Sequence, residues 1–515
     1  MMKRKKIFIL AISTFVIGSL SESCTKLDLK PYSAEKSSSF YQTPAQLAAG
    51  VAPAYTALQN LPDGNVYQMN EVTSDEIIVP TRGNDWYDGG NWQSLWLHKF
   101  KPDVVVDGSW SDLNGGIGKV NFILNVLSNL PSKPSNYNAV VAELKVLRAY
   151  YLFQFMDMFG NVPLVTDYNT DPGKVGQQTQ AQVYAFLESE LTTNIPLLTT
   201  TVDKTTYGKM TQYGGYMILA KLYLNAQVYT GTAHWDKAIT ALNQVISSNK
   251  YSLTPNYFDN FSLTNRSSST ENILVVPFDN VNIGGNNWEM QTLHYQSQAT
   301  FGLSGQPWNG FCSTADVVNK YAVGDGRKAQ FLVGQQYAAD KVTPLKDTQT
   351  GLSLIFDPAL LTTISSSADA FRLAGARNIK YAPQSGTAGS QSEDMVLFRL
   401  ADAYLMLAEA SMHNGDNATA LTYVNKVRAR AGATAFASAD LTWQSLLDER
   451  SRELMWEGWR RNDLIRFQVA NPTVHYFTGA RTPSKTDDGD THTFIFPIPS
   501  PELSSNPNLK QNPGY

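Results

Sequence analysis

The chain has 515 residues, and its 41 basic and 45 acidic side chains leave a net charge of only −4. This balance argues against nucleic-acid binding, because proteins that bind nucleic acids carry a basic footprint. Charged residues make up 17% of the chain and aromatic residues 11%, a composition that favours a surface for neutral, hydrogen-bonding ligands.

The N-terminal segment has the pattern of an export signal. A basic cluster at residues 3–6 precedes an apolar run at residues 7–20, and small residues then lead to Cys24. The run is shorter than the roughly 20 residues that cross a bilayer, which is typical of a cleavable secretory peptide. We therefore predict cleavage before Cys24 and a lipid on that residue. Ser21 and Glu22 depart from the usual lipoprotein signal, so ordinary secretion with an unmodified cysteine stays open.

The cysteines and histidines give no pattern of a metal site. If Cys24 carries a lipid, Cys312 has no partner for an internal disulfide. The six histidines are scattered and lack metal-ligand spacing, such as two histidines one helical turn apart. We therefore expect neither a metal ion nor another cofactor.

Helical periodicity recurs in the first part of the chain. Helices are predicted near residues 43–58, 114–130 and 139–159. In the last of these, apolar residues recur every three or four positions and form one stripe: Leu144, Leu147, Tyr151, Phe155 and Met158. Gly160 and Pro163 then mark the end of the helix.

Two later pairs of helices resemble each other. Residues 212–229 and 235–248 form the first pair, and residues 399–413 and 416–431 form the second, each joined by a short turn that contains glycine. The spacing of small residues in the second pair resembles that of tetratricopeptide repeats, whose helices pack closely. Between the pairs, residues 259–392 are rich in Gly, Asn, Ser and Thr, which predicts a loop-rich insertion.

Five segments together resemble one family. They are ELKVLRAYYLFQFMDMFGNVPLV (143–165), DMVLFRLADAYLMLAEA (394–410), VNKVRARAG (424–432), ERSRELMWEGWRRNDLIRF (449–467) and FPIPSPELSSNPNLKQNPGY (496–515). In this order they resemble the SusD/RagB family, the outer-membrane nutrient-binding lipoproteins of Bacteroidetes.

The resemblance implies a mostly α fold with a tetratricopeptide-like scaffold of helix pairs. It implies these parts: a signal peptide (1–23) and one SusD-like domain (24–515), made of a helical scaffold (about 43–258 and 393–470), a loop-rich binding insertion (about 259–392) and an irregular C-terminal segment (471–515). The implied partner is a SusC-like TonB-dependent transporter, which the protein would cover as a lid. The implied location is the outer membrane, with a lipid anchor and a face toward the cell exterior.

The densest aromatic segment, residues 82–100, is the first candidate for the ligand site. Trp86 and Tyr87 stand there among glycines and polar residues. A sugar ring has apolar C–H faces and hydroxyl groups, so its binding loop needs flat aromatic rings with planar donors and acceptors nearby. The polar residues that could supply these groups are Arg82, Asn84 and Asp85.

Two further tryptophans stand in turn sequences of the insertion. Trp288 follows Gly and Asn residues, and Trp308 lies between Pro and Asn. Neither has periodic apolar neighbours, so we predict that Trp86, Trp288 and Trp308 form an exposed stacking platform. Trp92 and Trp96, four residues apart, are instead predicted to lie in the core.

These observations predict a cell-surface lipoprotein that captures oligo- or polysaccharide, passes it to the transporter and catalyses no reaction. A β-linked plant glucan such as xyloglucan is the suggested ligand. One alternative is a peptide-binding protein of the RagB type, although Trp-rich Gly/Asn loops favour sugar. The other is a glycoside hydrolase, which needs two carboxylates across a cleft; the candidate pairs are Asp75 with Glu76 and Asp85 with Asp88. The charged residues of segment 449–461 are spaced three and four apart, which predicts ion pairs along a helix face.

Overall fold

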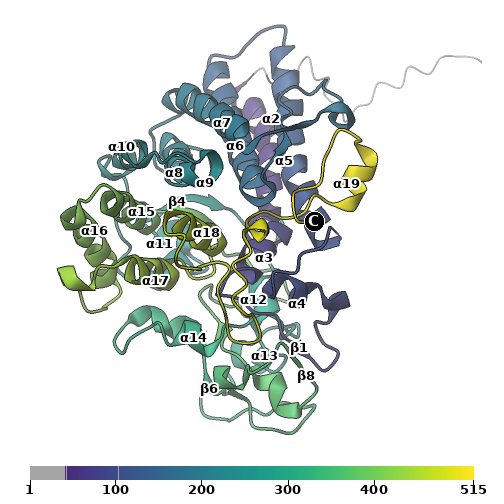
Figure 1. Cartoon of the computed structure of the whole chain (residues 1–515), viewed down its shortest axis with the longest axis vertical. Coiled ribbons are helices and arrows are strands. Elements are labelled where there is room, and N and C mark those ends of the chain that lie inside the picture. The colour runs from purple at the N-terminus through teal and green to yellow at the C-terminus, as the bar shows by residue number, and fades with distance from the viewer. Residues whose placement is uncertain (1–40, 42, 103) are drawn as a thin grey trace, which may run out of the picture.

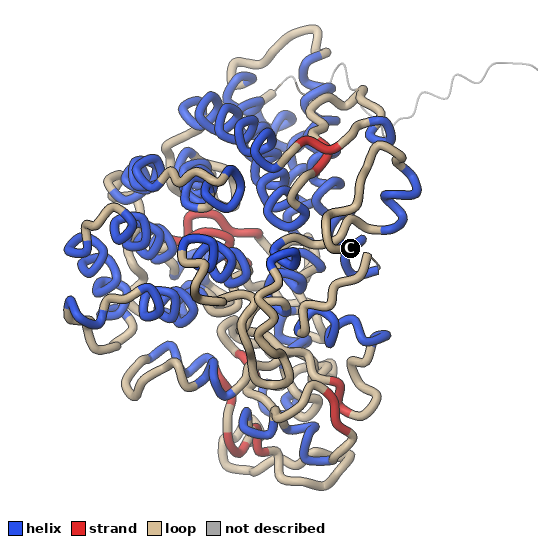
Figure 2. Tube along the Cα trace, in the orientation of Figure 1, coloured by secondary structure: helices blue, strands red, loops and turns tan. Residues whose placement is uncertain are grey.

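The computed structural model describes residues 41, 43–102 and 104–515. The predicted signal peptide and the predicted lipid site, Cys24, lie outside the described residues. Within them the chain is mostly helical with short strands, which confirms the predicted fold class (Figure 2). Helices fill the upper and left parts of Figure 1, and loops with short strands fill its lower end.

The first part of the chain forms a group of long helices. In chain order its main elements are α2 (Pro44–Thr56), α3 (Asn65–Val72), β1 (Thr81–Arg82), α4 (Asn91–Trp96), α5 (Val104–Ser128), α6 (Tyr137–Phe159), β2 (Val162–Pro163), β3 (Gln177–Gln178) and α7 (Gln180–Asn194). Helix α5 packs against α2, α3 and α6, and α6 packs against α7. Thr43 and Gln46 form a capping box that starts α2, and Gly160, with a φ of 71°, ends α6 as predicted.

Helix α5 begins ten residues earlier than its predicted start at residue 114. The extra turns contain Gly108 and β-branched residues, which have low helix propensity, so the local sequence gives a weak signal there. Packing compensates for it. A Cβ at Gly108 would lie 2.5 Å from the side-chain nitrogen of Asn65 on α3, so glycine allows the two helices to approach closely.

The two predicted helix pairs lie side by side although the insertion separates them in sequence. The later helices are α8 (Gln212–Leu224), α9 (Ala226–Thr230), α10 (Trp235–Ile246), α15 (Leu400–His413), α16 (Asn417–Arg430), α17 (Trp443–Leu454), α18 (Arg460–Ala470) and α19 (Ser500–Ser505). Helix α10 packs against both α8 and α15, and α15 packs against α16. Ala408 of α15 and Ala420 of α16 are fully buried in one apolar cluster, which also contains residues of α17. This burial of small residues agrees with close helix packing.

The insertion consists of short elements connected by loops. They are α11 (Asn265–Ser268), β4 (Asn272–Val276), α12 (Trp288–Thr292), α13 (Ser297–Phe301), α14 (Ala315–Val318), β5 (Phe331–Leu332), β6 (Gly334–Gln335), β7 (Ile355–Phe356), β8 (Ser365–Ser366), β9 (Arg377–Asn378) and β10 (Met395–Arg399). Strands β4 and β10 pair antiparallel, with Met395 opposite Val276. Strand β8 pairs in parallel with β1. The insertion therefore leaves and rejoins the helices at one place and contacts the first part of the chain through β1. The predicted division of the chain into domains stays a prediction.

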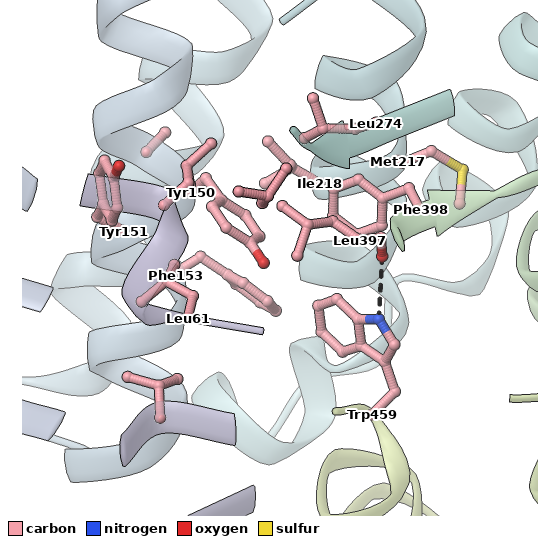
Figure 3. Close-up of a cluster of buried hydrophobic side chains, with 14 of the residues drawn as sticks. Leu61, Tyr150, Tyr151, Phe153, Met217, Ile218, Leu274, Leu397, Phe398 and Trp459 are labelled. Carbon is pink, nitrogen blue, oxygen red and sulfur yellow. Dashed lines mark hydrogen bonds between the residues drawn. The ribbon is translucent and has the colours of Figure 1, made fainter. Parts of the chain in front are cut away.

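The main core joins the long helices to the β4–β10 pair (Figure 3). Tyr150 and Phe153 of α6 face Ile218 of α8 and Phe398 of β10 across this core. The indole nitrogen of Trp459 donates a hydrogen bond of 3.2 Å to the carbonyl of Leu397. A buried indole needs such a partner, because an unpaired buried N–H is costly.

Charged residues of the 449–461 segment are structural, but most of them do not pair along one helix face. Arg452 and Glu449 form the expected pair within α17. Glu449 and Glu453, however, both bind buried Arg327 of the insertion at 2.8 Å. The prediction of helix-face ion pairs is therefore confirmed for Glu449 with Arg452 but wrong for Glu453, because α17 is covered by other segments and the partners of Glu453 come from other elements.

Two fully buried glutamates stand apart from this network. Neither Glu289 nor Glu393 has a hydrogen-bond partner for its carboxylate oxygens within the described part of the chain. Burial raises the pKa of Glu393 to about 8. Burial, and then the charge of Glu393, raises the pKa of Glu289 well above its ordinary range. Both groups therefore favour the protonated form in the folded protein.

Replacing Glu393 by Gln should stabilise the protein more at pH 8 than at pH 5. The pKa of Glu393 is higher in the folded than in the unfolded chain, so the folded state binds more protons between about pH 4.5 and pH 8. The parent therefore loses stability as pH rises through this window, by up to about 1.4 kcal/mol per pH unit. Glutamine keeps the shape without losing a proton. Urea unfolding of both proteins at the two pH values measures the gap, and a gap that stays constant would contradict the prediction.

Candidate functional site

Trp86 lies in the turn between β1 and α4. Its φ of 59° puts a bulky residue in the left-handed region, which such residues rarely adopt. Its indole nitrogen donates a hydrogen bond of 2.7 Å to the carbonyl of Trp308, and its ring packs against Trp92 and Phe311 at centroid distances of 5.7 and 5.6 Å. A Cβ at Gly310 would come within 2.3 Å of this ring. Trp86 is therefore held by the loop that carries Trp308, and part of its surface stays accessible.

Trp308 is exposed, with 41% of its surface accessible. Its backbone N–H donates to the carbonyl of Met290 at 2.8 Å, and that of Asn309 donates to the carbonyl of Leu293 at 2.8 Å. The side chain of Asn309 is buried and accepts a hydrogen bond of 2.6 Å from Arg377. The Trp308 loop is thus fixed on α12 and the residue that follows it, while the indole itself reaches solvent.

Arg82 does not lie where the sequence predicted a ligand contact. Its side chain is buried, and its guanidinium donates to the carbonyls of Asn309 at 2.7 Å, Gly310 at 3.0 Å and Ala374 at 3.0 Å. The prediction that Arg82 is available to a ligand is wrong, because the side chain is buried and its terminal nitrogens bind the loop after Trp308 and Ala374. Arg82 is instead a positioning residue for that loop.

Trp288 is the second correction. Only 2% of its surface is accessible. Its indole nitrogen donates to the hydroxyl of Tyr67 at 3.1 Å, and its ring makes edge contacts with Tyr381 and Trp456, both at 5.2 Å. The predicted exposure is wrong because residues distant in sequence cover α12. Trp288 belongs to the core below the Trp308 loop.

Trp92 and Trp96 are buried, which confirms their predicted place in the core. Each indole nitrogen has an acceptor. Trp92 donates to the carboxylate of Asp88 at 2.6 Å, and Trp96 donates to the carbonyl of Pro483 at 2.8 Å. The first contact connects the turn after Trp86 to α4, and the second connects α4 to the C-terminal segment.

A polar group that the sequence did not reveal lies beside the Trp86 turn. The hydroxyl of Tyr295 donates to the carboxylate of Asp85, and the guanidinium of Arg372 lies 3.4 Å from the same carboxylate and 5.0 Å from the centre of the Tyr295 ring. Burial and then the hydrogen bond to Asp85 raise the pKa of Tyr295 to about 12, so the hydroxyl stays protonated. Asp347 accepts a 2.7 Å hydrogen bond from Arg372 and orients it. Tyr295 follows Trp288 closely in the sequence, whereas no local signal singles out Arg372.

The structure therefore gathers aromatic and polar side chains at one place, which we call the Trp86–Trp308 surface. Its members are Asn84, Asp85, Trp86, Tyr87, Tyr295, Trp308 and Arg372. Tyr87 is 56% accessible and Asn84 is exposed. Exposed aromatic rings can stack on an apolar ligand face, while the Asn84 amide and the partly exposed Asp85 carboxylate can bind its hydroxyls. Arg372 is buried and orients Asp85 from below. The surface suits a neutral ligand with many hydroxyl groups.

The carboxylates of the hydrolase alternative are engaged by protein groups. Asp75 binds Arg460 at 2.6 Å and Lys320 at 2.8 Å. Buried Glu76 accepts hydrogen bonds from Ser451 at 2.8 Å and from the backbone of Trp456 at 2.9 Å. Across residues 43–102 and 104–515, no cluster of three or more His, Cys, Asp or Glu is arranged to hold a metal ion.

None of the helices formed by the described residues combines the length and apolar character that crossing a membrane requires. Cys312 is a buried free thiol next to Arg82. It contributes to the packing below the Trp308 loop.

Two family models match the chain. The model described as the SusD family matches residues 362–515, and the model described as "Starch-binding associating with outer membrane" matches residues 26–224. Among curated proteins, the starch-binding protein SusD of Bacteroides thetaiotaomicron is 25% identical over 488 residues, which cover 87% of this chain and 85% of that protein.

Solved structures have the same fold. A laminarin-binding SusD-like protein aligns with a TM-score of 0.72 at 24% identity and covers 92% of this chain and 100% of its own. Surface glycan-binding protein A of Bacteroides thetaiotaomicron, solved in complex with laminarihexaose, aligns with a TM-score of 0.70 at 20% identity and covers 91% of this chain and 99% of its own. With both family models and the predicted sequence segments in agreement, the chain belongs to the SusD-like family.

Proposed function

We propose that this protein binds glycans at the outer membrane through the Trp86–Trp308 surface and catalyses no reaction. The observation that carries the proposal is the rigid presentation of Trp308 beside Trp86, with Tyr87 and the Asp85–Arg372 pair on the same surface. The names of the matched relatives support it, since they describe starch, laminarin and surface glycan binding. We propose a β-linked glucan as the ligand. The complex of one relative with laminarihexaose favours this class, and xyloglucan remains a second candidate within it.

The surface suits reversible capture. Stacking on an exposed ring contributes modestly at each sugar, and several such contacts along an extended glycan add up. Asp85 is occupied by Tyr295 and Arg372, and Asp88 by Trp92. These hydrogen bonds and ion pairs favour roles in shaping the surface over the acid and nucleophile roles of glycoside hydrolysis.

Family membership supports a partner and a location. We propose that the protein acts with a SusC-like TonB-dependent transporter, to which it delivers the captured glycan. The description of the matched family model supports association with the outer membrane. We propose further that a lipid on Cys24 anchors the protein and that the Trp86–Trp308 surface faces the cell exterior, where glycans arrive.

Affinity electrophoresis in gels that contain laminarin, xyloglucan or starch tests the proposal. We expect slower migration in at least one β-glucan gel and no release of reducing ends when the protein is incubated with the retained glycan. Unchanged migration in every gel would contradict glycan binding and direct attention to the peptide alternative. Release of reducing ends would contradict the absence of catalysis.

A further inference from the structure

A cavity of about 770 Å³ lies on the side of α5. Ligand pockets commonly have volumes of about 300–1,000 Å³. Residues of α5, the loop after β2, and α19 with the residues after it line this cavity. In Figure 1, α5 and α19 lie in the upper part of the molecule, whereas α13, β1 and β8 lie in the lower part. The cavity is therefore separate from the Trp86–Trp308 surface.

Hydrogen bonds between distant segments fix the walls of this cavity. Asn121 of α5 donates to the carbonyl of Val165 at 2.9 Å, and its own side-chain oxygen accepts from Arg148 at 2.8 Å. On the other side, Asn506 donates to the carbonyls of Pro172 at 3.1 Å and of Val175 at 2.9 Å. The site is thus formed in advance, which lowers the entropic cost of binding.

The lining combines apolar, neutral polar and acidic groups, the last from Asp167 and Glu502. Trp110, Ile117 and Leu509 supply buried apolar side chains, and Asn114 and Ser111 supply hydrogen-bonding groups. No Lys, Arg or His is among the described residues that line the cavity. A phosphorylated, sulfated or uronic ligand would lack a counter-charge there and would meet the carboxylates of Asp167 and Glu502. The lining therefore favours an uncharged ligand, with both apolar and hydroxyl faces, over an anionic one.

An exposed aromatic pair stands at the edge of the cavity. Tyr168 lines the cavity and is 50% accessible, and its ring makes an edge contact with exposed Phe122 at 5.2 Å. The pair presents flat apolar surface to solvent beside the polar groups of the wall. On these grounds we propose that the cavity is a second saccharide-binding site, with Tyr168 as its stacking ring. This inference rests on the proposed glycan-binding function.

A second site would matter most for long glycans. When one polymer occupies two sites on the same protein, the second binding event is intramolecular, and the combined affinity can exceed that of either site by about 10²–10⁴. Short oligosaccharides occupy the two sites independently. We therefore expect each protein to bind two molecules of a short oligosaccharide, one at each site.

Gly118 offers a way to close the cavity without disturbing the core. It lies in α5 on the cavity wall, and a Cβ placed there meets no heavy atom within 4 Å. Gly118→Leu should therefore project into the cavity, and it raises helix propensity as well. Lys119→Leu is the matched control, since it places the same side chain on the next, exposed position of α5, outside the cavity lining. Thermal unfolding followed by circular dichroism verifies that both variants fold.

The test titrates laminarihexaose, cellohexaose and maltohexaose into the parent, both α5 variants, Trp308→Ala, and Trp308→Ala combined with either Gly118→Leu or Lys119→Leu. For the hexasaccharide that the parent binds, calorimetry should show two molecules per protein. Trp308→Ala should keep one weaker event, which Gly118→Leu reduces at least tenfold and Lys119→Leu leaves unchanged.

If the parent binds only one molecule, Trp308→Ala weakens that binding and Gly118→Leu leaves it unchanged, the second site is overturned and the proposed function stands. If none of the three hexasaccharides binds the parent and no glucan gel retains it, the proposed function fails, and the second site fails with it. If Gly118→Leu keeps both binding events but prevents copurification with the transporter, the cavity binds a protein partner, and the saccharide assignment is overturned.

Discussion

Replacing Trp308 by alanine should weaken binding of the retained β-glucan about 30-fold, which corresponds to roughly 2 kcal/mol. Trp308 is the most exposed tryptophan of the Trp86–Trp308 surface, and its loop is fixed from below by Arg82, Arg377 and α12. A rigid aromatic ring loses little entropy on binding, so most of its stacking energy contributes to affinity. Calorimetric titration of the parent and the variant with laminarihexaose measures the difference.

Tyr337→Ala is the matched control. Tyr337 is 40% accessible, almost as much as Trp308, but it lies outside the Trp86–Trp308 surface. Its removal should leave affinity within about twofold of the parent, because exposed side chains away from an interface contribute little. Equal affinities for the parent and Trp308→Ala would show that glucan binds elsewhere. Equal losses in Trp308→Ala and Tyr337→Ala would show that the loss is not specific to this surface.

Trp288→Ala should behave differently from both. Its indole fills the core between Tyr67, Tyr381 and Trp456, so the main effect is a lower stability of the fold, by about 3–5 kcal/mol.

The contrast between Trp288 and Trp308 shows how little the local sequence says about exposure. Both tryptophans stand in turns of Gly, Asn or Pro, and both were predicted to be exposed. What separates them is cover from residues far away in the chain, which spacing and composition do not reveal.

The helices were more predictable than the site for a related reason. The apolar stripe of α6 and the residues that end it are local, so residues 139–159 were placed within two residues of the observed helix. Trp86, Tyr87, Asn84 and Asp85 also came from local composition, and the structure brings them together with Trp308 at one surface. Arg372 could not be identified, since its position beside Asp85 depends on the path of the whole insertion.

The burial of the charged network could not be predicted from the sequence either. Glutamates and arginines three and four residues apart have the same pattern whether a helix is exposed or covered. In this fold α17 is covered by β10, α16 and the insertion, so its carboxylates receive guanidinium groups from three directions. Burial alone would raise the pKa of Glu453, but Arg430, Arg399 and Arg327 hold it well below its usual range. The network therefore joins the insertion to the helices.

Arg399→Met should lower the free energy of unfolding by about 3–5 kcal/mol, because removing one partner of a buried ion pair leaves charges uncompensated. Arg399 is fully buried at the end of β10. Its guanidinium contacts the carboxylates of Glu271 at 2.7 Å, Glu457 at 2.8 Å and Glu453. Such a loss is large, because the free energy of unfolding of a typical domain is only roughly 5–15 kcal/mol. Urea unfolding, followed in parallel by circular dichroism and tryptophan fluorescence, measures it.

Two further variants separate the network from the loss of any charge. Lys237 and Glu188 form an ion pair at 2.7 Å with the lysine side chain half exposed, so Lys237→Met should cost less than about 1 kcal/mol. Arg399→Lys keeps the charge but loses the planar fork that reaches several carboxylates at once, so it should recover only part of the lost stability. Full recovery by lysine would mean that charge alone matters at this position. Equal effects of Arg399→Met and Lys237→Met would contradict the network as the link between the insertion and the helices.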